Sequence, residues 1–311
     1  MKKLFSLILT IALAVSMLAG CAHFYKSDYA LMIGVATSQA GGKVSHTVAA
    51  IVIDKDYRIV SCRIDSIDIN AADDDNNISI ADSYSSKMEL GDKYGMLTNS
   101  PYYGSSLAEW DDQAKAFESY VIGKTRDEVK AITDKDGMVT DTALTAGCTI
   151  AVSDFMKAID KAFTSKNMVG LQTKSDITLG VSICASASQK SEGNVTYSAD
   201  FGAVAIVDGK ILAAVIDSKE VSSDIVEGEF SKITDNGTKL EQGDDYGMLT
   251  NSPYYGSSLG EWYEQAQAFA DSAVGVDVSE IAGLATEGVA GCTIYAGGYK
   301  QALEKAAKYA R

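Results

Sequence analysis

The chain has 311 residues, of which 42 are acidic and 27 are basic, so its formal net charge is −15. It is long enough for two domains of ordinary size, and so acidic a surface argues against nucleic acid and anionic lipid headgroups as partners. With only two histidines and no Cys-x-x-Cys pair, the sequence predicts neither a metal site nor a catalytic cysteine–histidine pair.

Residues 1–20 have the features of a secretory signal peptide: Lys2 and Lys3 at the start, an apolar run over residues 4–17, and small residues at the expected cleavage site. The run is too short for a transmembrane span, which needs about 20 apolar residues. The ending Leu-Ala-Gly-Cys resembles the bacterial lipobox, which implies cleavage before Cys21 and attachment of lipid to its thiol. We expect residues 21–29 to be a tether and the mature protein to be lipid-anchored at the extracytoplasmic face of the bacterial cell membrane.

Strands are predicted early in the chain, over residues 30–38, 47–53 and 59–64. A pair of glycines separates the first two, and the polar segment between the last two is typical of a hairpin. The acidic segment 73–77 lacks the alternating ligands and the distal glutamate of a calcium-binding loop. We therefore interpret it as a solvated loop.

Residues 94–110 recur as residues 246–262 with a single change, from Ala108 to Gly260. Gly, Asn-Ser-Pro and Gly-Ser-Ser are turn-forming sequences, so most of each copy is predicted to be an irregular loop. Because rigid scaffolds usually carry their functional groups on loops, we interpret this aromatic-rich segment, the repeated loop, as a candidate functional site. A recent duplication that has not yet diverged is the alternative interpretation.

Helices are predicted after each copy of the repeated loop. In the first half, Ser105 or Ser106 caps a helix whose apolar stripe includes Trp110. Trp110 and its counterpart Trp262 are expected to be core residues. A capping box at residues 125–128 opens a second, short helix. A third helix follows from Asp154.

The same order of elements returns after a polar linker over residues 164–175. Strands are predicted over residues 177–184, 201–207 and 211–216, followed by the second loop copy, a helix, a capping box at residues 277–280 and a terminal helix. Strand hairpins followed by grouped helices are typical of the α+β class. We predict two tandem homologous domains, residues 30–165 and 176–311, each a small antiparallel sheet packed with about three helices.

The cysteines after Cys21 are Cys62, Cys148, Cys184 and Cys292. Cys148 and Cys292 are equivalent positions of the two halves, whereas Cys62 and Cys184 match an alanine and a serine. A thiol that alternates with such small side chains indicates an unpaired, packed cysteine rather than a disulfide.

Each half carries the segment Ala-Gly-Cys-Thr-Ile shortly before its last helix, at residues 146–150 and 290–294. Small residues let a ligand approach the backbone closely, a threonine offers a hydroxyl, and the start of a helix favours an anion. The pattern predicts a phosphate beside Gly147 and Thr149 in the first half and beside Gly291 and Thr293 in the second.

The order of hairpin, glycine-bearing loop, helix, small-Gly-small-Thr segment and terminal helix resembles the FMN-binding domain of bacterial extracytoplasmic flavoproteins. That family includes the flavin-carrying subunits of sodium-pumping quinone reductases and tandem-domain lipoproteins of extracellular electron transfer. Its motif is Ser-Gly-Ala-Thr preceded by Asp, and the Thr carries FMN through a phosphoester bond. Residues 287–293 are similar, with Glu for Asp, Ala for Ser and Cys for Ala, whereas the acidic residue of the first half, Asp141, is out of register.

The resemblance implies FMN attached covalently through Thr149 and Thr293, in an electron carrier without substrate chemistry of its own. Its partners would be a redox protein and a flavin transferase. Aromatic and methionine side chains of the repeated loop would then flank the flat isoalloxazine ring, or alternatively fill the end of the sheet. They are Tyr94, Met96, Tyr102 and Tyr103 in the first half and Tyr246, Met248, Tyr254 and Tyr255 in the second.

A second interpretation belongs to another class: a surface lipoprotein without flavin, whose two repeated loops grip a peptide, a sugar or a partner protein. Two such loops on one chain would bind bivalently and gain from effective concentration. A hydrolase is disfavoured, because the sequence offers no nucleophile with a histidine base.

Overall fold

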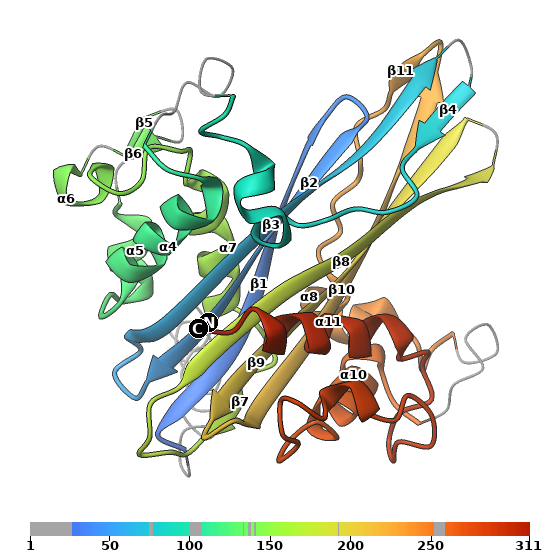
Figure 1. Cartoon of the computed structure of the whole chain (residues 1–311). Helices are drawn as coiled ribbons and strands as arrows, with labels where there is room; N and C mark the ends of the chain where they lie inside the picture. Colours follow the sequence, from blue (N-terminus) through green and yellow to red (C-terminus); the bar gives the residue numbers. More distant parts are fainter. Residues whose placement is uncertain are drawn as a thin grey trace, which may run out of the picture.

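The computed structural model describes residues 27–74, 77–99, 107–132, 134–135, 138–139, 141–191, 193–251 and 259–311. The predicted signal peptide and Cys21 lie outside these ranges, as do four tyrosines of the repeated loop: Tyr102, Tyr103, Tyr254 and Tyr255. Figure 1 shows two sheets of long antiparallel strands that cross in the middle of the molecule, with helices on either side.

The first half forms a five-stranded sheet of order β4-β3-β2-β1-β7. Its long strands are β1 (Tyr29–Ala40), β2 (Lys43–Asp54) and β3 (Ile59–Asp74), and its edge strands are β4 (Asn77–Ile80) and β7 (Val169–Leu171). The predicted strands are present and are longer than predicted. Residues 169–171, predicted as part of the linker, pair with residues 29–31 instead, because the open edge of β1 offers backbone partners.

The second half forms a four-stranded sheet of order β11-β10-β9-β8. Its strands are β8 (Thr178–Ser191), β9 (Asn194–Val207), β10 (Lys210–Val226) and β11 (Glu229–Phe230). Asp208 and Gly209, with φ angles of 51° and 76°, form the two-residue turn between β9 and β10. A turn with two positive φ angles matches the twist of the flanking strands, so it fixes the register of this hairpin.

Helices follow the strands in each half. Those of the first half are α2 (Lys87–Leu90), η2 (Gly91–Tyr94), α4 (Trp110–Val121), α5 (Arg126–Lys130), α6 (Thr142–Thr145) and α7 (Ser153–Phe163), with strands β5 (Asp134–Lys135) and β6 (Met138–Val139) after α5. Those of the second half are α8 (Lys239–Gln242), η3 (Gly243–Tyr246), α10 (Trp262–Asp271), η4 (Ile281–Gly283) and α11 (Gly297–Lys308). The mixed α and β class is confirmed. None of the helices in the described ranges is both long and apolar enough to span a membrane.

Helix starts agree with the prediction in one place and differ in another. The capping box at Thr125 opens α5 as predicted. Helix α4 begins at Trp110, with Glu109 in extended conformation as its N-cap, and the predicted caps Ser105 and Ser106 lie outside the described residues. The box at residues 277–280 opens only the short 3-10 helix η4. Asp277 is engaged there with the N–H and hydroxyl of Ser279, at 3.0 and 2.6 Å, in a local turn that competes with a helix cap.

The two sheets face each other, and their inner faces form one apolar core. This core includes Leu31, Ile33 and Val48 of the first half and Leu179, Val181 and Phe201 of the second. Helices α4 and α7 cover the outer face of the first sheet, and α10 and α11 cover that of the second (Figure 1).

The helix crossings are close in both halves. A Cβ on Gly34 of β1 would lie 2.2 Å from the backbone N of Ala162 in α7. A Cβ on Gly180 of β8 would lie 2.0 Å from the carbonyl O of Ala306 in α11. Only glycine permits such an approach, so one glycine in each half sets the spacing between sheet and terminal helix.

Reciprocal ion pairs join the two halves. Lys161 of α7 pairs with Glu241 of α8 at 2.9 Å, and Lys305 of α11 pairs with Glu89 of α2 at 2.8 Å. The two lysines are equivalent positions of the repeat, and so are the two glutamates. The terminal helix of each half therefore contacts the short helix of the other half in the same way.

A buried carboxyl anchors each short helix. Asp65 of β3 and Asp217 of β10 are equivalent positions, and each is 2% exposed. Each accepts the N–H of the following residue and, at 3.1 Å, the N–H of Met88 in α2 or Leu240 in α8. Burial raises the pKa of both carboxyls to about 7. These two groups therefore fix the helices that lead into the repeated loops.

The pH dependence of stability follows from the raised pKa of Asp65 and Asp217. Because each pKa moves from 3.8 to about 7, the folded chain holds more protons than the unfolded chain between about pH 4 and pH 7. This stabilisation is complete below the window and is lost as the pH rises through it. Relative to Asp65→Asn or Asp217→Asn, the wild-type free energy of unfolding should therefore fall by on the order of 2 kcal/mol from about pH 4 to about pH 7.5.

Urea denaturation at several pH values measures this difference. The exposed Asp56 provides the control, since Asp56→Asn should keep the pH dependence of the wild type. If the Asp65 and Asp217 variants also kept it, the two carboxyls would not be the groups responsible.

Candidate functional site

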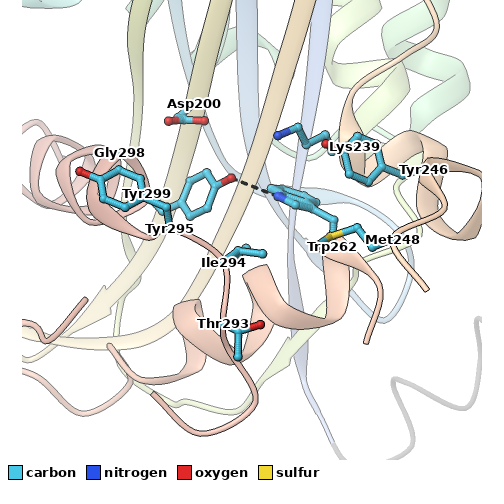
Figure 2. Close-up of a pocket in the computed structure, with 10 residues that line it drawn as sticks. All are labelled: Asp200, Lys239, Tyr246, Met248, Trp262, Thr293, Ile294, Tyr295, Gly298 and Tyr299. Carbon is cyan, nitrogen blue, oxygen red and sulfur yellow. Dashed lines mark hydrogen bonds between the residues drawn. The ribbon is translucent and has the colours of Figure 1, made fainter. Parts of the chain in front are cut away.

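A cleft of about 490 Å³ lies in the second half, where β9, α8, the repeated loop and the start of α11 meet. We call it the second-half cleft, and Figure 2 shows its lining. The lining residues are Asp200, Lys239, Tyr246, Met248, Trp262, Thr293, Ile294, Tyr295, Gly298 and Tyr299. Three residues named from the sequence, Tyr246, Met248 and Thr293, are thus brought together in one hollow.

One wall of the cleft is aromatic. Nζ of Lys239 lies 5.4 Å from the ring centroid of Tyr246 and 5.5 Å from that of Trp262. Nε1 of Trp262 donates to the hydroxyl of Tyr299 at 3.0 Å, and the two rings meet edge to face (Figure 2). Burial raises the pKa of Tyr299, so its phenol stays neutral. Trp262 and Tyr299 are only 2% and 7% exposed, so this wall is mostly buried, and Lys239 lies over the ring faces of Tyr246 and Trp262.

Asp200 is the acidic group of the cleft. It lies opposite Ser218 of β10. Burial raises the pKa of Asp200, and this effect outweighs the opposing effects of the Ser218 hydroxyl and the charge of Lys239. A Cβ on Gly298 would lie 2.2 Å from Asp200 Oδ2. The carboxylate thus occupies space that any side chain at position 298 would need.

The first half has no carboxylate at the strand position that matches Asp200. Thr47 stands opposite Ser66 there, as Asp200 stands opposite Ser218. The hydroxyl of Thr47 donates to Ser66 Oγ at 3.1 Å, and both side chains are buried. A neutral pair of hydroxyls therefore replaces the charged group of the second half.

The aromatic wall itself is common to both halves. Nζ of Lys87 lies 5.3 Å from the ring centroid of Tyr94 and 5.6 Å from that of Trp110. Trp110 meets Phe155 edge to face at 5.7 Å, where the second half has the hydrogen-bonded Tyr299. Met96 is buried like its counterpart in the second half. The first half thus repeats the wall without the phenol.

The residue at the start of the terminal helix also differs. Asp154 stands where the second half has Gly298, and its carboxylate accepts from Lys157 Nζ at 3.0 Å. The acidic side chain of the first half is therefore on the helix and partly exposed, whereas that of the second half is on the strand and faces the cleft.

Glutamines hold the two threonines that the sequence names as attachment sites. Gln265 Oε1 accepts the N–H of Thr293 at 2.9 Å and its hydroxyl at 2.8 Å. Gln113 Oε1 does the same for Thr149, at 2.8 and 3.0 Å. Each glutamine Nε2 donates at 2.9 Å to a backbone carbonyl at the start of its own helix, which fixes the orientation of the amide.

This arrangement opposes a phosphoester at either threonine. The side chains of Thr149 and Thr293 are exposed, so a modifying enzyme could reach both hydroxyls. The hydroxyl is a donor to the glutamine oxygen, and esterification would remove its proton and leave two acceptors facing each other. Turning the amide round would instead break its two backbone hydrogen bonds. The residues of the second half fit the flat ring of a flavin better than they fit a covalent link to it.

Buried glutamates hold the first residues of the repeated loop. Glu261 accepts the N–H of Met248 at 2.8 Å and that of Leu249 at 3.0 Å. Glu109 makes the same two bonds to residues 96 and 97, at the same distances. Each glutamate thus joins the start of its loop to the start of the helix that follows the loop.

The predicted glycines are closely packed, and neither of them lines the second-half cleft. A Cβ on Gly147 would lie 2.8 Å from Cβ of Ala116, and one on Gly291 would lie 3.1 Å from Cβ of Ala268. Gly291 also has a φ of 81°, which other residues rarely adopt. Their role is in packing.

The cysteines named from the sequence are free thiols throughout the described residues. Cys148 is fully buried, as predicted, whereas Cys292 is only half-buried. Cys292 lines a second hollow of about 610 Å³ that shares Thr293 with the second-half cleft.

Several residues of the site are absent from the sequence prediction: Asp200, Lys239, Glu261, Gln265 and Tyr299. A signal existed for three of them, since Lys239, Glu261 and Gln265 recur at the matching positions of the first half. Asp200 and Tyr299 are replaced by Thr47 and Phe155 in the first half, so the repeat does not point to them. In the ranges that the structure covers, no group of His, Cys, Asp and Glu side chains could hold a metal ion.

Comparison with known proteins gives no match to a family model, to a curated protein or to a solved structure. Function must therefore be argued from the site.

The bonds of Glu261 lead to a local prediction. In Glu261→Ala the N–H groups of Met248 and Leu249 lose a charged acceptor, and such bonds contribute about 1.5–3 kcal/mol each. Hydrogen exchange at these two amides should therefore accelerate by roughly tenfold to a hundredfold. Exchange measured residue by residue on the whole protein checks this.

The first half supplies the matched control. Glu109→Ala should accelerate exchange at Met96 and Leu97 and leave the amides of Met248 and Leu249 unchanged. A uniform acceleration over the whole chain in either variant would contradict a local clamp.

Proposed function

We propose that this protein is a lipid-anchored extracytoplasmic electron carrier that binds one FMN in the second-half cleft. The observation that carries the proposal is the aromatic wall of Tyr246, Trp262 and Tyr299 with Lys239 beside it, in a cleft of about 490 Å³. The isoalloxazine ring offers flat apolar faces to such a wall. Cofactor sites are typically of this size and combine apolar side chains with placed polar groups, as this cleft does.

The proposal holds the flavin without a covalent bond. The family resemblance implies a phosphoester at Thr149 and Thr293, but the hydroxyls of these residues donate to Gln113 and Gln265. Thr293 would instead lie beside the bound flavin, as part of the lining.

The proposed location rests on the sequence at the start of the chain. The apolar run and the Leu-Ala-Gly-Cys ending support lipid on Cys21 and a location at the outer face of the bacterial cell membrane. A redox protein at the same membrane would then exchange electrons with the flavin.

A titration with FMN tests the proposal. The mature chain should quench FMN fluorescence, and Tyr246→Ala and Lys239→Met should weaken binding about threefold to tenfold, as expected for the loss of one aromatic or cationic contact. Tyr94→Ala and Lys87→Met, at the matching positions of the first half, should leave the affinity unchanged.

The lipid anchor has its own test. In cells, labelled palmitate should be incorporated by the wild type and not by Cys21→Ser.

The same material distinguishes the alternatives. A fluorescent band on a denaturing gel, with added mass on the peptide that contains Thr293, would establish the covalent link and refute non-covalent binding. Protein that neither carries nor binds FMN would refute the flavin proposal.

A second candidate function is a flavin-free module that grips a partner through the repeated loops. Large apolar side chains flank each loop and are exposed: Leu97 by 48%, Leu107 by 45%, Leu249 by 45% and Leu259 by 59%. Apolar side chains gathered on a surface are typical of binding sites for other molecules. The FMN titration separates the two candidates, because this one requires no quenching.

We also propose that the halves, residues 30–165 and 176–311, are homologous domains that pack as one body. The support is the shared order of strands and helices and the reciprocal pairs Lys161–Glu241 and Lys305–Glu89. After cleavage at a protease site placed in the linker near Ser175, the halves should stay together in gel filtration and unfold in one transition. Halves that separate would contradict the single body.

A further inference from the structure

We propose that the second-half cleft recognises the imide edge of the flavin, with Asp200 accepting the ring N3–H and Lys239 donating to a neighbouring carbonyl. This inference rests on the proposed function and adds the orientation of the ring and the group that is recognised. It follows from the polar atoms at one side of the cleft, which the aromatic wall alone does not explain.

Asp200 provides an acceptor that faces the cleft. Its carboxylate lines the cleft, opposite Ser218 of the neighbouring strand, and the positive charge of Lys239 acts on it. An ionised carboxylate has about four lone-pair sites, so acceptor capacity remains. When a ligand excludes water from the cleft, that capacity must be met by a donor on the ligand, since an unsatisfied buried acceptor is costly.

Lys239 provides a donor at the same side. Figure 2 shows its Nζ, the carboxylate of Asp200 and the hydroxyl of Tyr299 gathered on one side of the cleft, with Thr293 at the opposite end. An acceptor and a cationic donor side by side match a ligand edge on which an N–H stands next to carbonyl oxygens. In isoalloxazine that edge is C2=O, N3–H and C4=O.

This orientation directs the opposite edge of the ring toward the exposed end of the cleft. Thr293 is exposed there. The dimethylbenzene edge would lie at this end, where a redox partner can approach it. The ring would thus be recognised at its buried edge and exchange electrons through its open edge.

The first half cannot make the same recognition. Thr47 replaces the carboxylate and already donates to Ser66, and Phe155 replaces the phenol. Asp154 lies on the helix, and its two oxygens already accept from Lys157 Nζ at 3.0 Å and from Ser38 Oγ at 3.5 Å. One flavin per chain is therefore expected, bound in the second half.

The test compares flavins with and without the N3 proton. FMN, riboflavin and their 3-methyl derivatives are titrated into the mature wild-type chain and into Asp200→Asn, Asp200→Thr and the control Asp154→Asn. Asp200→Thr carries the residue that occupies the matching position of the first half, and circular dichroism confirms that each variant folds. Riboflavin separates recognition of the ring from any contribution of the phosphate.

The wild type and Asp154→Asn should bind FMN and riboflavin at least about tenfold more tightly than the 3-methyl forms, because a site built for an N–H rejects an analogue without it. Both Asp200 variants should lose most of this discrimination. Wild-type protein that binds both forms equally, or an Asp200 variant that still discriminates, would overturn the inference and leave the proposed function standing. Protein that binds none of the four flavins would overturn both.

Discussion

The contact between the inner faces of the two sheets is the constraint on which the rest of this structure depends. The long strands are apolar on both faces: Met32 packs under the helices of its own half, and its neighbour Ile33 packs in the core between the sheets. Neither sheet can leave its inner face in water, so the halves must pack together. Helices are then confined to the outer faces, which brings α8, the repeated loop and the start of α11 around the second-half cleft.

The sequence predicted the strands where apolar residues dominate and failed where buried residues are polar. Residues 65–74 of β3 and 217–226 of β10 were missed because Asp65, Asp217 and Lys219 look like loop residues. Their partners come from elsewhere in the chain: Asp217 accepts from Leu240, and Lys219 pairs with Asp235. No local sequence pattern predicts such pairs. Asp200 and Tyr299 of the cleft were not predicted for the same reason.

The two loop copies are held by the same contacts in both halves. Glu109 and Glu261 hold the loop backbone, and Gln113 and Gln265 hold the following threonine segments, in the same way in both halves. Two identical loops therefore do not imply two identical binding sites. The site is distinguished by the residues that the halves do not share.

The close approach of Gly298 to Asp200 couples a strand and a helix start that lie far apart in the sequence. With Asp200 in place, a side chain at position 298 would displace the carboxylate, because a Cβ there would lie 2.2 Å from Oδ2. The first half has the opposite arrangement, with the acidic residue on the helix at Asp154 and Thr47 on the strand. The place of the acidic group in each half therefore depends on two residues together, so a single substitution at position 298 would also change the cleft.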